Sequence, residues 1–459
     1  MSSRLRSILR THWAFILIVV LFLCLRLYHL SILTTFGGDQ GQDFLVVRDM
    51  IVLHKFTLIG IKTSIADFFQ GPLYLYLLFP LFSLMHLNPL AGALTAVVLA
   101  MVSLFALYIT LITFFNKNTA LGSCLLLTVS PEFVRYGNTP LYQNFLPLFL
   151  VLSFYMYLKV NEKRTFGLAL LLGMFAGICM ELHFLAVTLT LAFLILLLVK
   201  RFPKRVLILY CLGVIVGLSP TIFFELRHNF LNTHLLINYL TSYKTSSFSL
   251  QTSLNAWFEG AGKFLGGNNT SIGILLLIFS GYSLVKTWKN KVYSPLIQLF
   301  VCLIVILVVF TFVFSNLLPH YLLPLWIMLV ILIPLFIEKV SMKLTVRLGF
   351  LLILVVVNLS TTLTQLGSTH GYDMPDGWTL QKAVRVGDMI AKDSKTHPNF
   401  NVAFLLDGNT RSYPLRYVLA TQNAVPGSVT DYPSTTYLYV VSRPKDNLFK
   451  TMVWEVASV

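Results

Sequence analysis

The sequence predicts an all-α polytopic membrane protein with a small C-terminal α/β domain outside the membrane. The first observation is composition, because 56% of the 459 residues are hydrophobic and only 11% are charged. The second is the recurrence of apolar runs of about 20 residues, the length that crosses the hydrocarbon core of a bilayer. The third is the tail, whose composition is more polar than that of the preceding chain. We therefore expect a membrane domain over 1–364 and a soluble extracytoplasmic domain over 365–459.

The distribution of charge predicts the orientation. The net charge is +16, a value that in a soluble protein would suggest a nucleic-acid partner. Here 17 of the 34 basic residues, but only two of the 18 acidic residues, fall in the N-terminus and in alternate loops. This is the positive-inside pattern of membrane proteins. The excess charge therefore reports topology and predicts no nucleic-acid partner. It places the N-terminus in the cytoplasm and the C-terminal domain outside the cell membrane.

The first two apolar runs need separate interpretations. The run over about 13–33 has a basic start but no small-residue cleavage site, so we interpret it as a retained span and not as a signal peptide. The loop over 34–71 is then outside. The next run, about 72–86, is short and contains Pro80. If it crossed the membrane, every later basic loop would lie on the wrong side. We expect a re-entrant or interfacial helix there, and a short true span is the alternative.

The remaining runs alternate regularly with polar turns. The strongest inside signal is the basic turn over 200–205, and about 11 transmembrane helices are expected in all. A polar outer loop is predicted over about 226–270. After the first span, the predicted spans are about 89–114, 119–133, 141–158, 166–180, 184–199, 206–224, 272–288, 294–315, 319–337 and 345–364.

The tail has the pattern of a small α/β or α+β module. Residues 378–392 have helical spacing, whereas 401–406 and 436–441 contain the β-branched and aromatic residues typical of strands. We find no internal repeat, which many transporters have.

An acidic pair marks the first outer loop. Asp39 and Asp43 lie in the segment 36–44, and Arg48 and Asp49 follow. Carboxylates are rare in this chain, and none is needed in the middle of a span, where an ion-coupled transporter usually keeps ionisable groups. We therefore expect a reaction centre at the membrane surface. The alternative is structural: Asp39 would cap a helix that begins near Phe44, and the other three would form a helix-start charge cluster.

Other outer turns carry further polar candidates, namely Arg135, Arg227, His183, His228 and His320. The two arginines have an alternative role as interfacial anchors, and His320 with Tyr321 has one as an interfacial belt pair. Glu181 and His183 would supply only two metal ligands, which is an unspecific set, so no metal site is predicted. The five cysteines lie in apolar runs and indicate neither a disulfide framework nor a metal cluster.

Four short motifs together resemble the GT-C glycosyltransferases. That superfamily includes the protein O-mannosyltransferases, the aminoarabinose transferases of lipid A and the RgtA/B/C/D-like group, all similar to glycosyltransferase family 39. Segments 39–50 and 71–76 resemble the two ends of the family's first outer loop. Segment 130–136 resembles its Ser-Pro…Ser-Arg turn, and 320–324 its Arg-Tyr-Leu-Leu-Pro turn. The likeness extends over about 13–340.

The sequence also departs from the family at several positions. Gln40 replaces the Glu after the first Asp, and Gln70-Gly71 replaces Lys-Pro, which puts a lysine contact to the donor phosphate in doubt. Lys62 is a candidate substitute for that lysine. Gln143 or Asn144 stands where the family has a second Asp, and His320 stands for Arg.

The resemblance implies inverting transfer of a sugar from a polyprenyl-phosphate donor to a lipid, glycan or protein acceptor. It also implies the outer face of a bacterial inner (plasma) membrane. Asp39 would be the general base, and Asp43 would orient an acceptor or bind a cation. No cofactor is predicted, and a divalent cation is left open. The predicted donor phosphate and sugar contacts are Arg48, Lys62, Tyr74, Arg135, Tyr136, Tyr142, Arg227, His228, His320 and Tyr321.

Two alternatives remain at this stage. A lipid-linked glycan flippase also needs a lipid groove and basic contacts, but it carries out no bond chemistry. An outer-face polymerase or ligase of glycans would use a diphosphate-linked donor. The acidic pair in a loop and the lack of acidic residues in the middle of the predicted spans favour an enzyme over the flippase.

Overall fold

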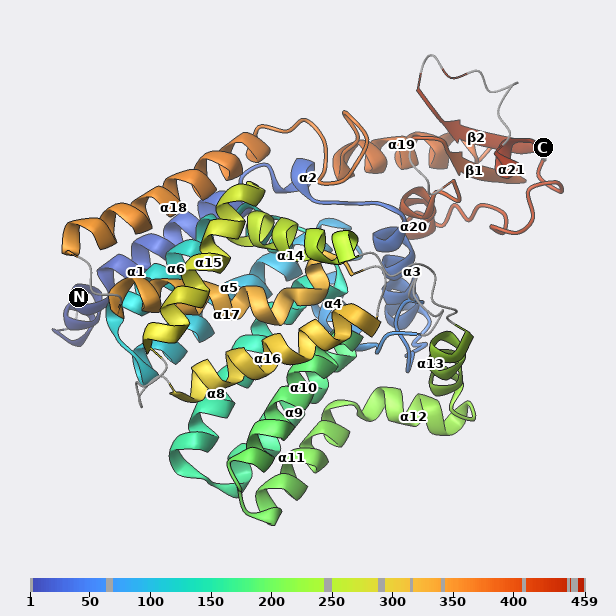
Figure 1. The fold of residues 1–459 in the computed structure, drawn as a ribbon. Helices are drawn as coiled ribbons and strands as arrows, with labels where there is room; N and C mark the ends of the chain where they lie inside the picture. The colour runs from blue at the N-terminus through green and yellow to red at the C-terminus, as the bar shows by residue number, and fades with distance from the viewer. Residues whose placement is uncertain are drawn as a thin grey trace.

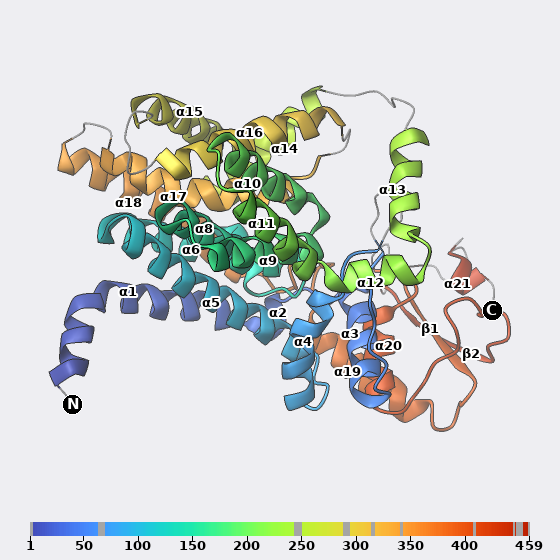
Figure 2. The ribbon, with the colours of Figure 1, turned by 90° about the horizontal axis from the view of Figure 1, so that it is seen from below.

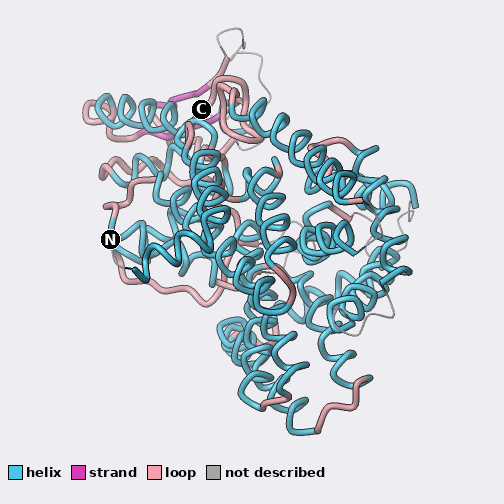
Figure 3. Tube along the Cα trace, turned by 90° about the vertical axis from the view of Figure 1, so that its left-hand side faces the viewer, coloured by secondary structure: helices cyan, strands magenta, loops and turns pink. Residues whose placement is uncertain are grey.

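The structure is a computed structural model. It describes residues 3–62, 69–242, 250–287, 294–313, 317–339, 343–406, 410–443, 446 and 453–457. Helices form one bundle, and the two strands that the described residues contain lie together in the C-terminal segment (Figures 1 and 3). The bundle consists of α1 (Ser3–Leu27), α5 (Leu90–Phe114), α6 (Lys117–Val129), α8 (Leu146–Lys163), α9 (Phe166–Leu182), α10 (Val187–Val199), α11 (Lys204–Gly217), α15 (Thr270–Thr287), α16 (Ser294–Val313), α17 (Leu323–Lys339) and α18 (Leu344–Leu366).

The remaining elements connect these helices or cover one end of the bundle. The α-helices among them are α2 (Leu30–Leu33), α3 (Gly38–Val52), α4 (Leu73–Leu84), α7 (Pro131–Tyr136), α12 (Ser219–Arg227), α13 (Leu231–Ser242) and α14 (Leu250–Leu265). Three 3₁₀ turns precede long helices: η1 (Tyr142–Phe145), η2 (Phe184–Ala186) and η3 (Pro319–Leu322).

Length and hydropathy identify the candidate spans. Six helical stretches among the described residues are long and apolar enough to cross a membrane, and up to seven if the pair α11 and α12, bent by 69°, is one span. The prediction of a polytopic helical membrane protein is confirmed, and the count of about eleven remains a prediction. The six are Leu90–Phe114, Tyr142–Lys163, Thr270–Thr287, Ser294–Phe312, Pro319–Lys339 and Leu344–Leu366; shorter apolar helices are Thr11–Leu27, Leu73–Leu84, Phe166–Leu182 and Phe184–Val199.

Helix α17 runs through the centre of the bundle, whereas α18 lies at its edge (Figure 1). In the most apolar stretch of the span that includes α17, 94% of the residues are buried, against 11% in that of α18. The sequence of α17 explains this position, because it is apolar on every face and such a helix is buried. Trp326 fills the space beside Gly260, and its indole N–H donates to the Pro319 carbonyl at 2.7 Å.

The structure contradicts the structural alternative for Asp39 and adds two helices to the predicted loop over 226–270. Helix α3 begins at Gly38, not near Phe44, and its N-cap is Gly37. The backbone N–H of Gly37 donates to the side chain of Gln40 at 3.0 Å, so Asp39 lies in the first helical turn and is not the cap. The predicted polar loop over 226–270 contains α13 and α14. Helix α14 forms because it has one apolar face, which buries Ala261 and Phe264.

The C-terminal segment packs against the end of the bundle that carries α3 (Figure 2). It contains α19 (Leu380–Asp393), β1 (Phe400–Phe404), α20 (Tyr413–Thr421), β2 (Tyr437–Val441) and α21 (Trp454–Ala457). The strands are parallel, with Phe400 opposite Tyr437 and Phe404 opposite Val441. The helix and strands predicted here are confirmed, and every boundary agrees within two residues. The structure adds α20, and the domain boundary at 364 remains a prediction.

Candidate active site

The acidic pair lies on one face of α3, at the end of the bundle opposite the chain's N-terminus (Figure 1). Residues four apart on a helix are neighbours, so the carboxylates of Asp39 and Asp43 lie one turn apart. Asp39 is exposed, whereas Asp43 is only 1% exposed. Neither carboxylate oxygen of Asp43 has a hydrogen-bond partner among the described residues. Asp39 therefore presents an open carboxylate, whereas the carboxylate of Asp43 is enclosed.

The environment raises the pKa of both acids. Burial is the larger cause for Asp43, whose pKa lies well above its ordinary 3.8, and the charge of Asp39 adds to it. Desolvation by the surrounding protein also raises the pKa of Asp39, although one side of this residue is open. Paired carboxylates with raised pKa values are typical of sites that transfer protons.

Two tyrosines from other elements face the acidic pair. Tyr74 at the start of α4 is buried, and its hydroxyl has no partner among the described residues. Both Tyr74 and Tyr142, the first residue of η1, are close enough to interact electrostatically with Asp39 and Asp43. The structure therefore brings α3, α4 and η1 together, as the sequence predicted for these residues. Tyr136 lies deeper, packed at the edge of the Phe133 and Phe264 rings.

A cluster of aromatic and histidine rings continues from Tyr142. Its ring stacks on His183 at 5.8 Å between centroids, and His183 lies 5.7 Å from His320 and 5.5 Å from Tyr321. His320 and Tyr321 lie 4.5 Å apart. Burial, with a smaller contribution from His320, lowers the pKa of His183 to about 3, so this imidazole is neutral near pH 7. The sequence offered His183 as one of several outer-turn candidates and as half of a weak metal pair, and the structure places it at the centre of this cluster.

Glu181 contacts the other end of the first outer loop. A Cβ on Gly71 would lie 1.5 Å from Glu181 Oε2, so the loop backbone rests on this carboxylate. Glu181 Oε1 accepts from the backbone N–H of Thr221 at 3.1 Å, while Oε2 is buried without a partner among the described residues. Close backbone approach explains why Gly71 stands in the segment that resembles the family's Lys-Pro. Sequence reasoning did not identify this contact, because its partners come from different loops.

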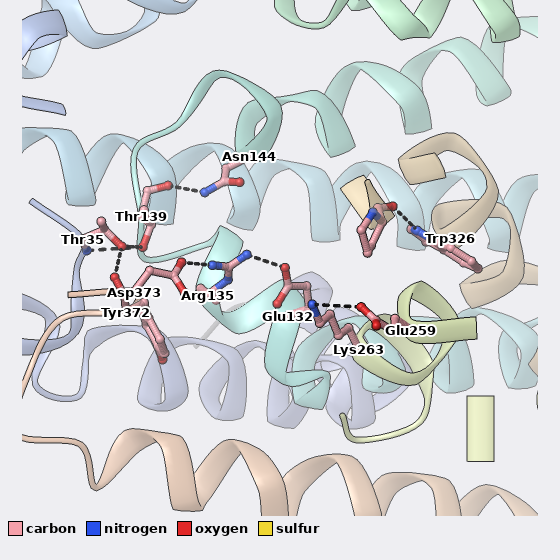
Figure 4. Close-up of polar contacts among 11 residues, drawn as sticks. Thr35, Glu132, Arg135, Thr139, Asn144, Glu259, Lys263, Trp326, Tyr372 and Asp373 are labelled. Carbon is pink, nitrogen blue, oxygen red and sulfur yellow. Dashed lines mark hydrogen bonds and ion pairs between the residues drawn. The ribbon is translucent and has the colours of Figure 1, made fainter. Parts of the chain in front are cut away.

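Arg135 is held by two carboxylates. It binds Glu132 at 2.6 Å through one guanidinium nitrogen and Asp373 through another, and Figure 4 shows it between them. Asp373 belongs to the segment after α18, so this contact joins the bundle to the tail. Arg135 as a phosphate contact remains a prediction, and binding there requires it to share or release one carboxylate.

Arg227 and His228 are more open. Both are exposed at the end of α12, and His228 stacks on Phe224 with ring centroids 4.2 Å apart. No ion pair of Arg227 occurs in the described part of the chain. Nearby, the Asn232 side chain bonds both the N–H and the carbonyl of Phe69, at 2.8 and 3.0 Å. The α12–α13 corner therefore fixes the end of the first outer loop.

Arg48 and Lys62, the other two cations predicted in the loop, have their described contacts with other residues. Arg48 pairs with Asp49 at 2.7 Å, and Lys62 is exposed, in an isolated antiparallel bridge with Phe69. Within the described ranges, no cluster of three or more His, Cys, Asp or Glu side chains is placed to hold a metal ion. The described interactions thus link the acidic pair to Tyr74 and Tyr142, and Arg135 to the ring cluster.

Comparisons with known proteins give one family model and several solved structures that resemble this chain. The family model for dolichyl-phosphate-mannose-protein mannosyltransferases matches residues 70–224, which extend from the end of the first outer loop into α12. No curated protein matches the chain. The match to the family model covers about a third of the sequence and includes Tyr74, Arg135, Tyr142 and His183.

Solved structures resemble nearly the whole chain. ArnT from Cupriavidus metallidurans bound to undecaprenyl phosphate is 13% identical over 90% of each chain, with a TM-score of 0.62. Its apo state is 15% identical over 92% of this chain and 90% of that one, with a TM-score of 0.63. The apo oligosaccharyltransferase of Archaeoglobus fulgidus is 9% identical, with a TM-score of 0.55, over 90% of this chain and 64% of that one. At such identities the likeness is one of fold.

Proposed function

We propose that this chain, a member of the GT-C superfamily of membrane glycosyltransferases, transfers a sugar from a polyprenyl-phosphate donor to a lipid, glycan or protein acceptor. The observation that carries the proposal is the pair on α3, in which Asp39 is open and Asp43 is enclosed. The donor class is supported by the description of the matching family model and by undecaprenyl phosphate in a structure of similar fold.

Asp39 is the proposed general base. As the acceptor oxygen attacks the anomeric carbon, the hydroxyl proton passes to the Asp39 carboxylate. The bond between the anomeric carbon and the phosphate oxygen breaks, and the polyprenyl phosphate leaves with its electrons. Desolvation raises the pKa of Asp39, which strengthens it as a base. Its exposure leaves room for an acceptor to approach.

Asp43 is the proposed positioning carboxyl. Its burial and raised pKa favour the protonated form, and a protonated carboxyl both donates and accepts hydrogen bonds. Tyr74, close to both acids, presents a further hydroxyl. These groups orient a sugar or acceptor hydroxyl toward Asp39 without adding a second negative charge beside the leaving phosphate.

Cations around the site are proposed to stabilise the leaving phosphate. Arg227 is the first candidate, because its guanidinium is exposed and matches phosphate geometry. His228 lies beside it, and Arg135, which also binds Glu132 and Asp373, is a second candidate. His320 is a candidate hydrogen-bonding group in the ring cluster. Arg48 and Lys62 remain candidates in the loop. The aromatic cluster of Tyr142, Tyr321 and the histidines then lines the path of the sugar or the prenyl chain.

The proposed location is the extracytoplasmic side of a bacterial inner membrane. The positive-inside pattern places the N-terminus in the cytoplasm, and α3 lies at the opposite end of the bundle (Figure 1). In that orientation the acidic pair and the C-terminal segment are both outside.

The test is sugar transfer from a panel of labelled polyprenyl-phosphate sugars, in membranes that contain the wild type or Asp39→Asn. This substitution keeps the shape of the side chain and removes the base. We expect a loss of about 10²–10⁴-fold, the usual contribution of general base catalysis, with donor binding retained. Asp388→Asn, on α19 in the tail, is the control and retains transfer.

Other results would change the proposal. Transfer that persists in Asp39→Asn moves the base to another group, with Asp43 first. Movement of the donor across the bilayer by the wild type, without transfer from any donor, supports the flippase instead.

A further inference from the structure

A polar cavity of about 290 Å³ lies where the bundle meets the C-terminal segment. Four parts of the chain build it: α7, the region from α14 to the following turn, the end of α18, and the linker that leads to α19. Its lining consists almost entirely of polar side chains, in a protein that is otherwise strongly apolar. The lining residues are Glu132, Arg135, Lys263, Asn268, Gln365, Ser368, His370, Gly371, Tyr372 and Asp373.

The wall of this cavity is tied to the acidic pair through the chain. The Thr35 hydroxyl donates to the Tyr372 carbonyl at 2.7 Å, and the Tyr372 N–H donates to the Leu33 carbonyl at 2.8 Å. Thr35 lies four residues before Asp39, so the linker is hydrogen-bonded to the segment that leads into α3. Figure 4 shows Thr35, Tyr372 and Arg135 in this arrangement. A ligand in the cavity would therefore be held at a fixed position relative to α3.

The cavity is also close to the ring cluster of the candidate active site. Arg135 and Lys263 both line it, and both are near enough for their charges to act on His320. Arg135 thus stands between the two sites. Its Nε–H is buried and has no acceptor among the described residues, although both terminal nitrogens bind carboxylates. A buried unpaired donor at a cavity wall is a group that a ligand oxygen would satisfy.

The charges in the lining select the class of ligand. Arg135 and Lys263 are positive, Glu132 and Asp373 are negative, and the two signs cancel. An anion such as phosphate would gain little from this balance, because the carboxylates repel it. Hydroxyl groups of a ligand suit this mixed lining. The carboxylates accept hydrogen bonds from hydroxyls, the ammonium and guanidinium groups donate to them, and the Asn268 and Gln365 amides do both. Neutral sugars are rich in such hydroxyls.

We propose that this cavity binds the carbohydrate part of the acceptor, so that the acceptor is a glycan or a glycan-bearing molecule. The inference rests on the proposed transferase function and narrows its acceptor class. Binding in the cavity would hold the acceptor while its reactive hydroxyl reaches Asp39.

Direct binding tests this without relying on turnover. The purified full chain is titrated with neutral oligosaccharides and, separately, with phosphorylated monosaccharides and inorganic phosphate, followed by saturation-transfer NMR and calorimetry. The test variant is Asn268→Gly combined with Gln365→Ala. Glycine suits residue 268, whose φ of 62° is left-handed, so the change removes the amide without straining the turn. Gln422→Ala, an exposed glutamine in the C-terminal segment, is the matched control.

We expect neutral oligosaccharides to bind the wild type and the control equally, and the double variant about tenfold more weakly, as for the loss of one or two hydrogen bonds. In transfer assays the acceptor KM should rise while donor hydrolysis without acceptor is unchanged. Equal glycan binding by the double variant, binding of phosphorylated ligands alone, or no binding by the wild type would each overturn the proposal. Failure of the transferase function itself appears separately, as a wild type that cleaves no donor.

Discussion

The backbone of Pro414 rests on Gly41, the residue midway between Asp39 and Asp43. A Cβ on residue 41 would lie 2.3 Å from the Pro414 nitrogen and 2.4 Å from the carbonyl carbon of Tyr413. Beside this contact, Tyr417 packs among Phe36, Phe44 and Phe82, and its hydroxyl donates to the Leu87 carbonyl at 2.6 Å. Helix α20 of the tail therefore covers the helix that carries the acids.

This contact predicts that Gly41→Ala damages both stability and transfer. The new methyl group meets backbone atoms that cannot rotate away, so α20 must shift and α3 loses its packing. We expect a cost of about 1–3 kcal/mol in unfolding free energy, the usual range for overpacking, measured by thermal unfolding in detergent. Gly281→Ala is the control: it lies in α15 with open space around it, so it should be neutral or slightly stabilising. Equal behaviour of the two variants would contradict the role of the Pro414 contact.

Gly71→Ala should be destabilising for a different reason. Its methyl group would overlap Glu181 Oε2, a side-chain atom, so Glu181 must move and lose its bond from the Thr221 N–H. The cost should again be about 1–3 kcal/mol. A double-mutant cycle with Glu181→Ala measures it, and the combined variant should cost less than the sum of the single changes. If the two unfolding free-energy changes were strictly additive, the methyl group added at residue 71 would not overlap the Glu181 side chain.

Replacement of Asp43 by Asn should stabilise the protein near pH 7. Burial raises the folded-state pKa of Asp43 above its ordinary 3.8. The group therefore favours folding at low pH, and this contribution is lost as the pH rises through the folded-state pKa. We expect Asp43→Asn to unfold on the order of 2–4 °C higher at pH 7 and to match the wild type below pH 3.8. Thermal unfolding across pH gives the answer, and a wild type that is the more stable of the two at pH 7 would refute it.

His183 should give a pH dependence of the opposite sign. Its pKa falls from 6.5 to about 3 in the folded chain, mainly through burial. Between these values the unfolded chain binds a proton that the folded chain does not, so stability declines as the pH falls from 6.5 toward 3. The variant His183→Gln should show a shallower decline over this window. Parallel unfolding curves of the two proteins would count against a neutral buried His183.

Arg227 should affect donor binding more than folding. It is exposed and forms no ion pair within the described chain, so Arg227→Gln leaves the fold intact. We expect the donor KM to rise about tenfold or more, because hydrogen bonds to charged groups contribute about 1.5–3 kcal/mol. Arg227→Lys should recover only part of this, since lysine lacks the bidentate geometry. A donor KM that stays constant while acceptor KM changes would assign Arg227 to the acceptor side.

The predictions from sequence succeeded where the signal is local. Apolar runs indicated long helices such as α5 and α18, because length and hydropathy are properties of the segment itself. Helix α14 was missed, since polar residues alternate with its apolar stripe and make the segment resemble a polar loop. The first turn of α3 was misplaced because Gly37 and Gly38 suggested a loop, whereas the Gln40 side chain closes the helix there.

The site was predicted in part for the same reason. Asp39, Asp43, Tyr74 and Tyr142 come together as expected, and their assigned roles remain predictions. The position of His183 depends on how α9 ends against η1 and η3, and no local pattern encodes that packing. The ion pair of Arg135 with Asp373 joins residues 238 positions apart, so only the folded chain reveals that this cation is already neutralised.

The contact of Gly41 with Pro414 also has a consequence for the order of synthesis. Gly41 is synthesised long before Pro414, which follows the helices of the bundle in the chain. Until α20 has been synthesised, the helix that bears the acidic pair has one face uncovered. A nascent or truncated chain without α20 would hold both carboxylates but lack the helix that packs against them. Completion of the packing around the acidic pair is thus coupled to synthesis of the C-terminal segment.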